Sequence, residues 1–180
     1  MSFNELVNQR RSCRTYLDQT VEREKIISCL EAARMAPSAC NSQPWRFVVV
    51  DDPEKRLELI PTLQSEFFRL NRFTEQVPVF VVVVEEAANL SAQFGGRFKD
   101  QEYALIDIGL AVENFCLAAT DQGLGTCILG WFSEDKVRDL LVIPKQRRVR
   151  LVIALGYPAE MPDSGRSRKP AEKAYSFNRY

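Results

Sequence analysis

Two short runs of the sequence, residues 47–50 and 79–84, contain only apolar residues, and they constrain the fold more than any other feature. Successive side chains of a β-strand point to opposite faces of the sheet, so an all-apolar strand has no face suited to water. Each run is also too short to form a stable helix alone. We therefore expect two buried strands in a small sheet that is covered by helices.

Patterns with helical spacing surround these runs and predict the covering helices. Ser2 and Glu5 have the spacing of a capping box, and Asp52-Pro53 pairs an N-cap residue with proline at the first helical position. The predicted helices cover residues 2–9, 22–36, 52–68, 101–122 and 133–141, and two further strands cover 126–129 and 148–156. The order predicts an α+β fold with a small central sheet flanked by helices, in one domain of residues 1–180.

The composition indicates where a protein of this kind resides. The longest apolar run, residues 77–84, is far shorter than the roughly 20 residues of a membrane-spanning helix. The chain opens on Met1-Ser2-Phe3-Asn4-Glu5, with neither the basic region nor the long apolar run of a secretion signal. Its five cysteines are widely spaced and odd in number, which does not suit a disulfide framework. We expect a cytoplasmic protein with no membrane partner.

The chain contains no histidine, which excludes several kinds of chemistry. It cannot supply a Ser–His or Cys–His nucleophile pair, a histidine ligand for zinc or a histidine general base. Proton chemistry near neutral pH must use carboxylates, Lys, Cys or Tyr, or a bound cofactor. The 24 basic and 24 acidic residues balance, which argues against nucleic acid as a partner.

Arginines gather at two places in the sequence. Arg10-Arg11-Ser12-Cys13-Arg14 follows the first predicted helix, and Arg166 and Arg168 lie near the C-terminus. Forked guanidinium groups beside a hydroxyl suit the binding of a phosphate or another anion. Taken alone, the first cluster is better explained as solvated surface charge, as most such clusters are, and ordinary tail charge is the alternative for the second.

The loop of residues 36–46 joins a helix to a buried strand. Asn41 and Gln43 each carry a hydrogen-bond donor and an acceptor, a combination that suits recognition of a ring with alternating polar atoms. Trp45 is expected to anchor the loop. The alternative is a structural loop whose amide side chains satisfy backbone groups.

A glycine-rich segment, residues 123–132, contains the third predicted strand. Gly123 and Gly125 do not complete the pattern of a dinucleotide-binding turn, so a Rossmann site is not supported. Gly130, at the end of the strand, permits the close approach of a planar ligand to the backbone, or marks a β-bulge.

Taken together and in order, these motifs resemble the nitroreductase family of FMN-dependent oxidoreductases. They are Arg10-Arg11-Ser12-x-Arg14, Pro37-Ser38-x-x-Asn41-x-Gln43-Pro44-Trp45, Gly123-Leu124-Gly125-Thr126 and Arg166-x-Arg168. The resemblance covers essentially the whole chain, and the second motif is its most specific part. It implies an obligate homodimer with FMN at the subunit interface and NADH or NADPH as the electron donor.

The resemblance also implies a role for each matching residue. Phosphate binding is implied for Arg10, Ser12, Arg166 and Arg168, with Arg11 contributing through its backbone. Arg14 is implied to face the pyrimidine edge of the flavin, with Leu129 and Gly130 near its N5 atom. Pro37, Ser38 and Asn41 are implied to reach the flavin from the other subunit. A cation at the pyrimidine edge favours the reduced, anionic flavin. No catalytic side chain is expected, because the flavin itself carries the hydride.

The implied reaction is a ping-pong hydride transfer, in which NAD(P)H reduces FMN and leaves before an acceptor takes the electrons. Nitroaromatics, quinones or a related small molecule would be the acceptor. The short stretch of residues 85–100 suggests an open active site. The alternatives are a flavin-fragmenting or dehalogenating relative, or a non-catalytic flavin-binding sensor or store.

The C-terminal tail carries Tyr175 and Phe177 two positions apart, as on one face of a strand. An extended aromatic tail suits addition to the edge of a sheet, which would make it a segment exchanged across the homodimer. The alternative is a tail that packs on its own domain.

Overall fold

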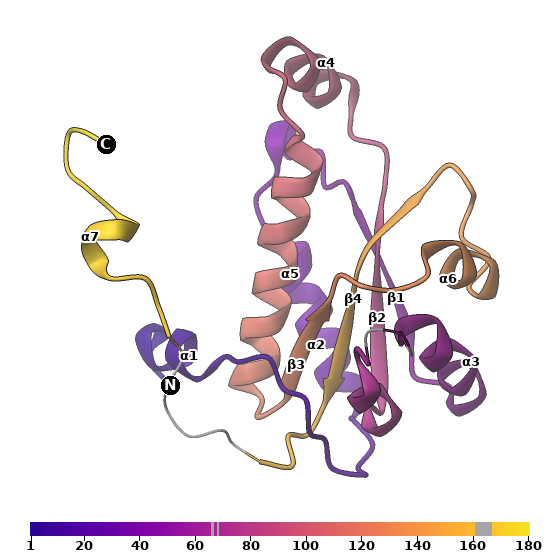
Figure 1. Cartoon of the computed structure of the whole chain (residues 1–180). Coiled ribbons are helices and arrows are strands. Elements are labelled where there is room, and N and C mark those ends of the chain that lie inside the picture. The colour runs from indigo at the N-terminus through magenta and orange to yellow at the C-terminus, as the bar shows by residue number, and fades with distance from the viewer. Residues whose placement is uncertain (66, 68, 161–166) are drawn as a thin grey trace.

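The computed structural model describes residues 1–180 apart from 66, 68 and 161–166 (Figure 1). Its strands are β1 (Trp45–Val50), β2 (Val79–Glu85), β3 (Gly125–Leu129) and β4 (Arg148–Gly156). Its α-helices are α1 (Phe3–Gln9), α2 (Arg23–Arg34), α3 (Pro53–Leu63), α4 (Leu90–Lys99), α5 (Tyr103–Asp121), α6 (Glu134–Leu140) and α7 (Ala171–Ala174), with 3₁₀ turns η1 (Ala39–Asn41) and η2 (Arg72–Gln76). The predicted α+β fold is confirmed, as are all four predicted strands.

The four strands form one antiparallel sheet in the order β1-β2-β4-β3. The two most apolar strands in the sequence therefore do not both lie in its centre, because β1 forms one edge. The register of β2 with β4 shifts between Val83 and Val84, so that Arg150 on β4 has no partner across the strand. Such a β-bulge bends the strand and redirects the side chain at that position.

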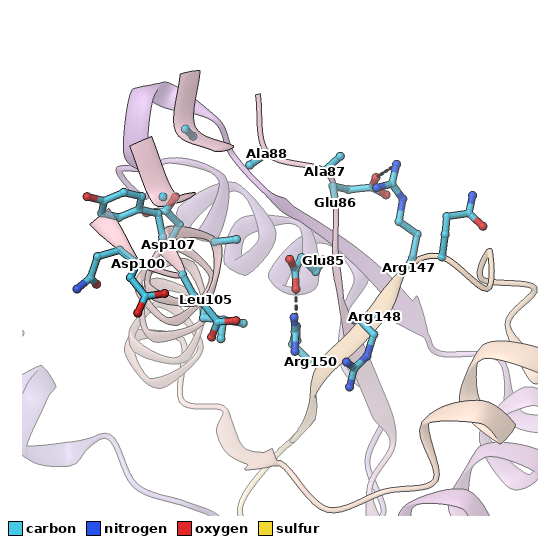
Figure 2. A pocket seen from close by; sticks show the side chains of 17 residues that line it. Glu85, Glu86, Ala87, Ala88, Asp100, Leu105, Asp107, Arg147, Arg148 and Arg150 are labelled. Carbon is cyan, nitrogen blue, oxygen red and sulfur yellow. Dashed lines mark hydrogen bonds and ion pairs between the residues drawn. The ribbon is translucent and has the colours of Figure 1, made fainter. Parts of the chain in front are cut away.

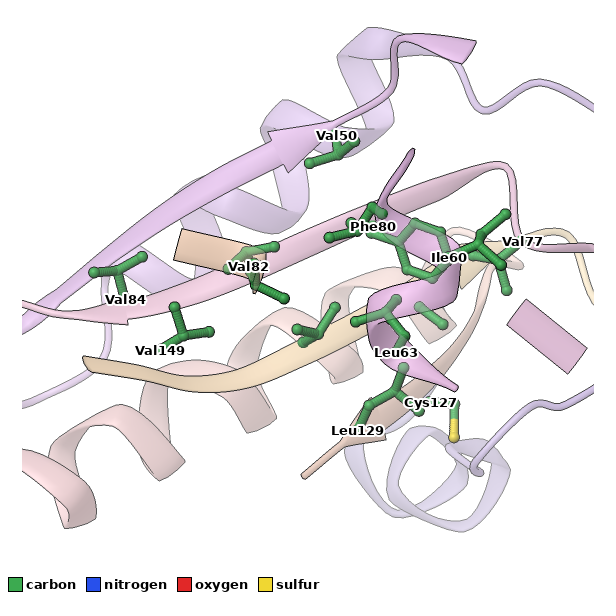
Figure 3. Packing of buried hydrophobic residues seen from close by; sticks show 14 of the residues in the cluster. Val50, Ile60, Leu63, Val77, Phe80, Val82, Val84, Cys127, Leu129 and Val149 are labelled. Atoms are coloured by element: carbon green, nitrogen blue, oxygen red, sulfur yellow. The ribbon is translucent and has the colours of Figure 1, made fainter. Parts of the chain in front are cut away.

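Each face of the sheet is covered by a different pair of helices. On one face, Phe80, Val82 and Val84 of β2 pack with residues of α3 and α6, as Figure 3 shows in part. On the other face, Val79, Val81 and Val83 pack with α2 and α5. Every one of these β2 side chains is buried, as the apolar run predicted.

Helix α5 is the long helix expected over residues 101–122, and it is a core helix. By length and composition alone it is apolar enough to cross a membrane. Its buried residues, however, include Ile108, Val112 and Phe115, which pack in the same cluster as α2 and the sheet. Part of its remaining surface is apolar and exposed, at Leu105, Ile106 and Leu110.

The predicted helix starts agree with the observed capping contacts. The Ser2 hydroxyl accepts a hydrogen bond from the Glu5 N–H, and the Glu5 carboxylate accepts one from the Ser2 N–H, which completes the capping box. The Asp52 carboxylate accepts a hydrogen bond from the Lys55 N–H at 2.9 Å. Helix α3 ends at Leu63 rather than near residue 68, because the backbone of Gln64 is already extended.

Two segments differ from the expectations. Residues 90–99 form α4, although two adjacent glycines in this stretch disfavour a helix. The helix forms because the Asn89 side chain accepts a hydrogen bond from the Ala92 N–H, and because Gly96 lets the Gln101 carbonyl oxygen approach its backbone closely. The tail contains the short helix α7, after which the backbone of Tyr175 is extended, and residues 167–180 are all exposed.

The N-terminal segment, residues 10–17, lies against the end of the sheet that contains the start of β3. The Cys13 N–H donates to the Thr126 carbonyl at 2.8 Å, and the Leu17 N–H donates to the Tyr157 carbonyl at 2.9 Å. Gly125 allows this close approach, since a Cβ atom there would lie 2.8 Å from the Cys13 Cβ and 2.9 Å from its Sγ. The path of the segment therefore depends on a glycine in β3.

We expect Gly125→Ala to displace the N-terminal segment and to lower the free energy of unfolding by about 1–3 kcal/mol, the usual cost of overpacking. Chemical denaturation measures this loss. Gly95→Ala in α4 is the control, because its Cβ would meet only the Tyr103 ring at 4.0 Å. Equal stability of the Gly125→Ala variant and the unmodified chain would contradict the predicted steric conflict.

Candidate functional site

The arginine cluster of the N-terminal segment lies at the edge of the sheet beside α5. Arg10 forms an ion pair with Glu113 of α5, at 3.4 Å between Nε and Oε1, and its side chain is 17% exposed. Ser12 forms a bridge with Thr126 of β3, and the side chain of Arg14 is exposed. The cluster thus presents one guanidinium group held by a carboxylate and another that is accessible to a ligand.

The other end of β3 carries Leu129 and Gly130. Leu129 is buried, whereas Gly130 is exposed, and a Cβ atom added to Gly130 would meet nothing within 4 Å. The backbone is therefore open to a planar group at this point. Thr126 and Gly130 are four residues apart, so the two predicted contact points on β3 are separated by about 13 Å.

Asn71 ties down the segment that follows Gly130. Its Nδ2 donates to the carbonyl of Leu63 at 2.8 Å and to the carbonyl of Trp131 at 3.1 Å. Asn71 itself has left-handed backbone geometry, with φ of 60°. These bonds hold the end of β3 to the end of α3.

A cavity of about 440 Å³ lies beside the N-terminal segment, between α1 and the start of β3. Arg11, Cys13 and Gly125 lie on its wall, together with residues from the end of α5. Of the arginines in the N-terminal cluster, Arg11 is the one that lines this cavity.

The loop between α2 and β1 is strained, although it contains no glycine. Cys40, Asn41 and Gln43 have φ values of 51°, 51° and 48°. Left-handed geometry costs a residue with a side chain about 1–2 kcal/mol, somewhat less for asparagine. Strain of this kind persists only where surrounding contacts enforce it, and it concentrates at functional sites.

Contacts within the loop explain part of this geometry. The Gln43 N–H donates to the Ser38 hydroxyl at 2.9 Å, and the Gln43 amide donates to Asn41 Oδ1 at 3.0 Å. The amide of Gln43 thus serves the loop itself, as the structural alternative predicted. Pro37 and Asn41 are exposed, and Trp45 begins β1 and packs against the core, as expected.

Two residues outside the loop attach it to neighbouring helices. Asp107 Oδ2 accepts a hydrogen bond from the Ala39 N–H at 3.1 Å, and Asn89 Nδ2 donates to the Cys40 carbonyl at 2.9 Å. Sequence reasoning missed both residues. The sequence does carry a signal for Asp107, because it is a single carboxylate between apolar neighbours in the first half of a mostly apolar helix.

A larger cavity of about 680 Å³ lies between α4, the start of α5, the end of β2 and the start of β4 (Figure 2). Ion pairs cross its far wall: Arg150 bonds to Glu85, and Arg147 lies 2.9 Å from Glu86. Asp107 lines the opposite, α5 side. Asp107, which accepts the hydrogen bond from the loop, therefore links the loop to the wall of this cavity.

Within one chain the two halves of the predicted site are not brought together. Arg10 meets α5 at Glu113, whereas the loop meets α5 at Asp107, six residues earlier. Six residues correspond to about 9 Å along a helix, and they place the two positions about 120° apart around its axis. The loop and the arginine cluster therefore contact α5 at different heights and on different sides.

The C-terminal arginines are placed only in part. Arg166 lies outside the described residues. Arg168 is exposed, and its guanidinium donates to the neighbouring Ser167 carbonyl at 3.2 Å. The structure therefore leaves the expected convergence of both arginine clusters untested.

Four of the five cysteines are buried, and only Cys40 is exposed. Desolvation is the main cause that raises the pKa of Cys29 to about 12 and the pKa of Cys116 to about 11. It also raises the pKa values of Cys13 and Cys127. A thiol in such surroundings stays protonated and unreactive at neutral pH, so these cysteines pack as small apolar residues.

Comparison with known sequences identifies the family of this chain. The nitroreductase family model matches residues 7–79 and 64–157. A protein of Archaeoglobus fulgidus, provisionally named NADH dehydrogenase/NAD(P)H nitroreductase, is 32% identical over 88% of this chain and 86% of its own length. A protein of the same provisional name from Methanothermobacter thermautotrophicus is 35% identical over 90% and 80%. Iodotyrosine deiodinase 1 of Sus scrofa is 27% identical over 95% of this chain and 66% of its own length.

Solved structures agree with these sequence matches. An FMN-dependent nitroreductase of Clostridium difficile superposes with a TM-score of 0.78 at 26% identity, over 97% of this chain and 98% of the other. The NfrA1 nitroreductase of Bacillus subtilis superposes with a TM-score of 0.80 at 27% identity, over 99% and 75%. The chain belongs to the nitroreductase family and is an oxidoreductase of that family.

Proposed function

We propose that the chain, residues 1–180 as one unit, binds FMN and transfers electrons from NADH or NADPH to a small-molecule acceptor by a ping-pong mechanism. One observation carries the proposal: β3 holds the arginine cluster at its start and an open glycine backbone at its end. A cytoplasmic location stays a prediction from the sequence.

The described residues fit FMN in charge and in shape. Arg10, Arg14 and the hydroxyl of Ser12 offer the donors that a phosphate and the polar edge of a flavin require. Gly130 leaves room for a ring against the backbone at the other end of β3. The separation of about 13 Å between these points suits an extended ligand with a charged end and a planar end.

FMN, when bound, supplies the redox chemistry by accepting a hydride and passing electrons on. The chain binds and orients the cofactor. Arg10 and Ser12, with Arg166, Arg168 and the Arg11 backbone, would hold the phosphate, and Arg14 would stabilise negative charge at the pyrimidine edge. The backbone at Leu129 and Gly130 would contact the ring. No histidine is required, since solvent supplies protons.

The proposal includes a homodimer, because the predicted site residues of the loop lie apart from the arginine cluster of the same chain. Pro37, Ser38 and Asn41 would complete the site of the partner subunit, in keeping with the separation of the two halves along α5. Leu105, Ile106 and Leu110 give α5 an exposed apolar strip suited to burial between subunits. The exposed aromatic tail is proposed to exchange across the same interface.

A nitroaromatic or a quinone is the proposed acceptor. The similarity to iodotyrosine deiodinase 1 adds a halogenated aromatic compound as a second candidate. A screen with one acceptor of each kind and free flavin, after reduction with NADH or NADPH, separates these alternatives by which compound reoxidises the protein.

We expect the protein reconstituted with FMN to hold about one FMN per subunit, with flavin absorbance at about 450 nm, and to lose this colour when NADH or NADPH is added without oxygen. Absorbance spectroscopy in an anaerobic cuvette measures both. A protein that takes up no FMN contradicts the proposal. Bound FMN that neither donor reduces would favour the sensor or store.

We expect Arg14→Ala to weaken FMN binding or to slow flavin reduction by about tenfold, because a charged hydrogen bond is worth about 1.5–3 kcal/mol. Titration of the apoprotein with FMN and stopped-flow absorbance measure the two quantities. Arg23→Ala in α2 is the matched control, since this arginine is exposed and pairs with Asp51. Unchanged affinity and rate would remove Arg14 from the site.

We expect Ile106→Glu to convert the dimer to a monomer and to release FMN, because it places a charge in the proposed α5 interface. Light scattering after size-exclusion chromatography reports the mass. Leu57→Glu in α3 is the control, because Leu57 is also apolar and exposed but lies on the opposite side of the sheet. A dimer that survives the Ile106 change excludes this interface.

A further inference from the structure

We propose that Asp107 of α5 is a positioning residue, whose buried carboxylate holds the loop of residues 38–43 in the shape that lets Asn41 reach a flavin. The inference rests on the proposed function, because it concerns the loop that the proposal assigns to the partner's FMN. It adds to that proposal a residue that would not touch the cofactor.

The burial of the Asp107 carboxylate costs free energy of folding, which indicates that this side chain has a specific role. The residue is 4% exposed and lies on a helix whose neighbouring positions are mostly apolar. A buried carboxylate destabilises a fold unless hydrogen bonds compensate it. The Ala39 N–H donates to Oδ2 at 3.1 Å, and Ala39 immediately precedes the left-handed residues Cys40 and Asn41.

Contacts within the loop cannot by themselves fix its place on the molecule. The bonds from Gln43 to Ser38 and Asn41 close the loop upon itself. They would persist if the whole loop tilted away from α5. The bond to Asp107 is the one that joins the loop to the buried helix of the core, so it sets the direction in which Asn41 points.

Asn89 provides a second attachment, from α4. Its Oδ1 accepts from the Ala92 N–H at 2.9 Å and caps α4, while its Nδ2 donates to the Cys40 carbonyl at 2.9 Å. Its backbone N–H also donates to the Ser42 hydroxyl at 2.8 Å. The loop is thus held between two helices, with Asp107 on one side and Asn89 on the other.

The test compares Asp107→Leu with Asp107→Asn, two side chains of similar size that differ in the hydrogen-bond acceptor. Asp107→Leu should weaken FMN binding to the full-length apoprotein by about tenfold or more, and Asp107→Asn by no more than about threefold. The visible circular dichroism of bound FMN should change in the leucine variant only. Thermal unfolding and the far-ultraviolet spectrum report whether each variant is folded.

Three outcomes overturn the inference: equal affinity of the leucine variant and the unmodified protein, an equal loss in both variants, or an unchanged dichroism spectrum. Asp139→Asn, an exposed carboxylate on α6 at the other face of the sheet, is the control for a change of charge. If the unmodified protein binds no FMN, the proposed function itself fails. If it binds FMN and the leucine variant binds it equally well, only the positioning role fails.

Asn89→Ser keeps the test decisive if the leucine variant does not fold. Serine caps a helix about as well as asparagine but is too short to reach the Cys40 carbonyl. We expect about threefold weaker FMN binding with no loss of helix content. Asn114→Ser is the matched control, because Asn114 also donates to a backbone carbonyl, that of Ala32 in α2. Equal affinity of the Asn89 and Asn114 variants counts against the loop attachment.

Discussion

The burial of β2 on both faces is the constraint on which the rest of the structure depends. Its alternating side chains require one helical layer from α2 and α5 and another from α3 and α6. With β1 and β4 on either side of β2, β3 is left at the edge. An edge strand offers free backbone groups, and here the N-terminal segment occupies part of them, which brings the arginines to the sheet.

Helix α5 connects this core to both halves of the site. Its inner side packs on the sheet, while Glu113 holds Arg10 and Asp107 holds the Ala39 N–H. The strained loop and the arginine cluster are therefore fixed to one rigid element rather than to each other. In the proposed homodimer a second subunit would close this divided site, and the apolar surface left on α5 is suited to contact it.

The strands and most helices could be predicted because their signals are local. The run 79–84 identifies β2 directly, and the capping residues Ser2 and Asp52 mark where α1 and α3 begin. Helix α4 was missed because Gly96 weakens the helical pattern. The reason for a glycine at this position is its close contact with the Gln101 carbonyl oxygen, which only the folded structure shows. The contact of Asp107 with Ala39 joins positions 68 residues apart, so no local pattern contains it. Site residues came instead from the family motifs, and their arrangement across two subunits is untested.

The absence of histidine agrees with a protein that binds and orients FMN while the cofactor carries out the redox chemistry. The buried cysteine thiols are not available as reactive groups, because burial raises the pKa values of Cys13, Cys29, Cys116 and Cys127. What the chain offers instead is fixed geometry, namely accessible guanidinium groups, an open glycine backbone and a loop held in a strained shape. In such a site, residues remote from the reacting atoms, such as Asp107, affect function through the precision with which they hold that geometry.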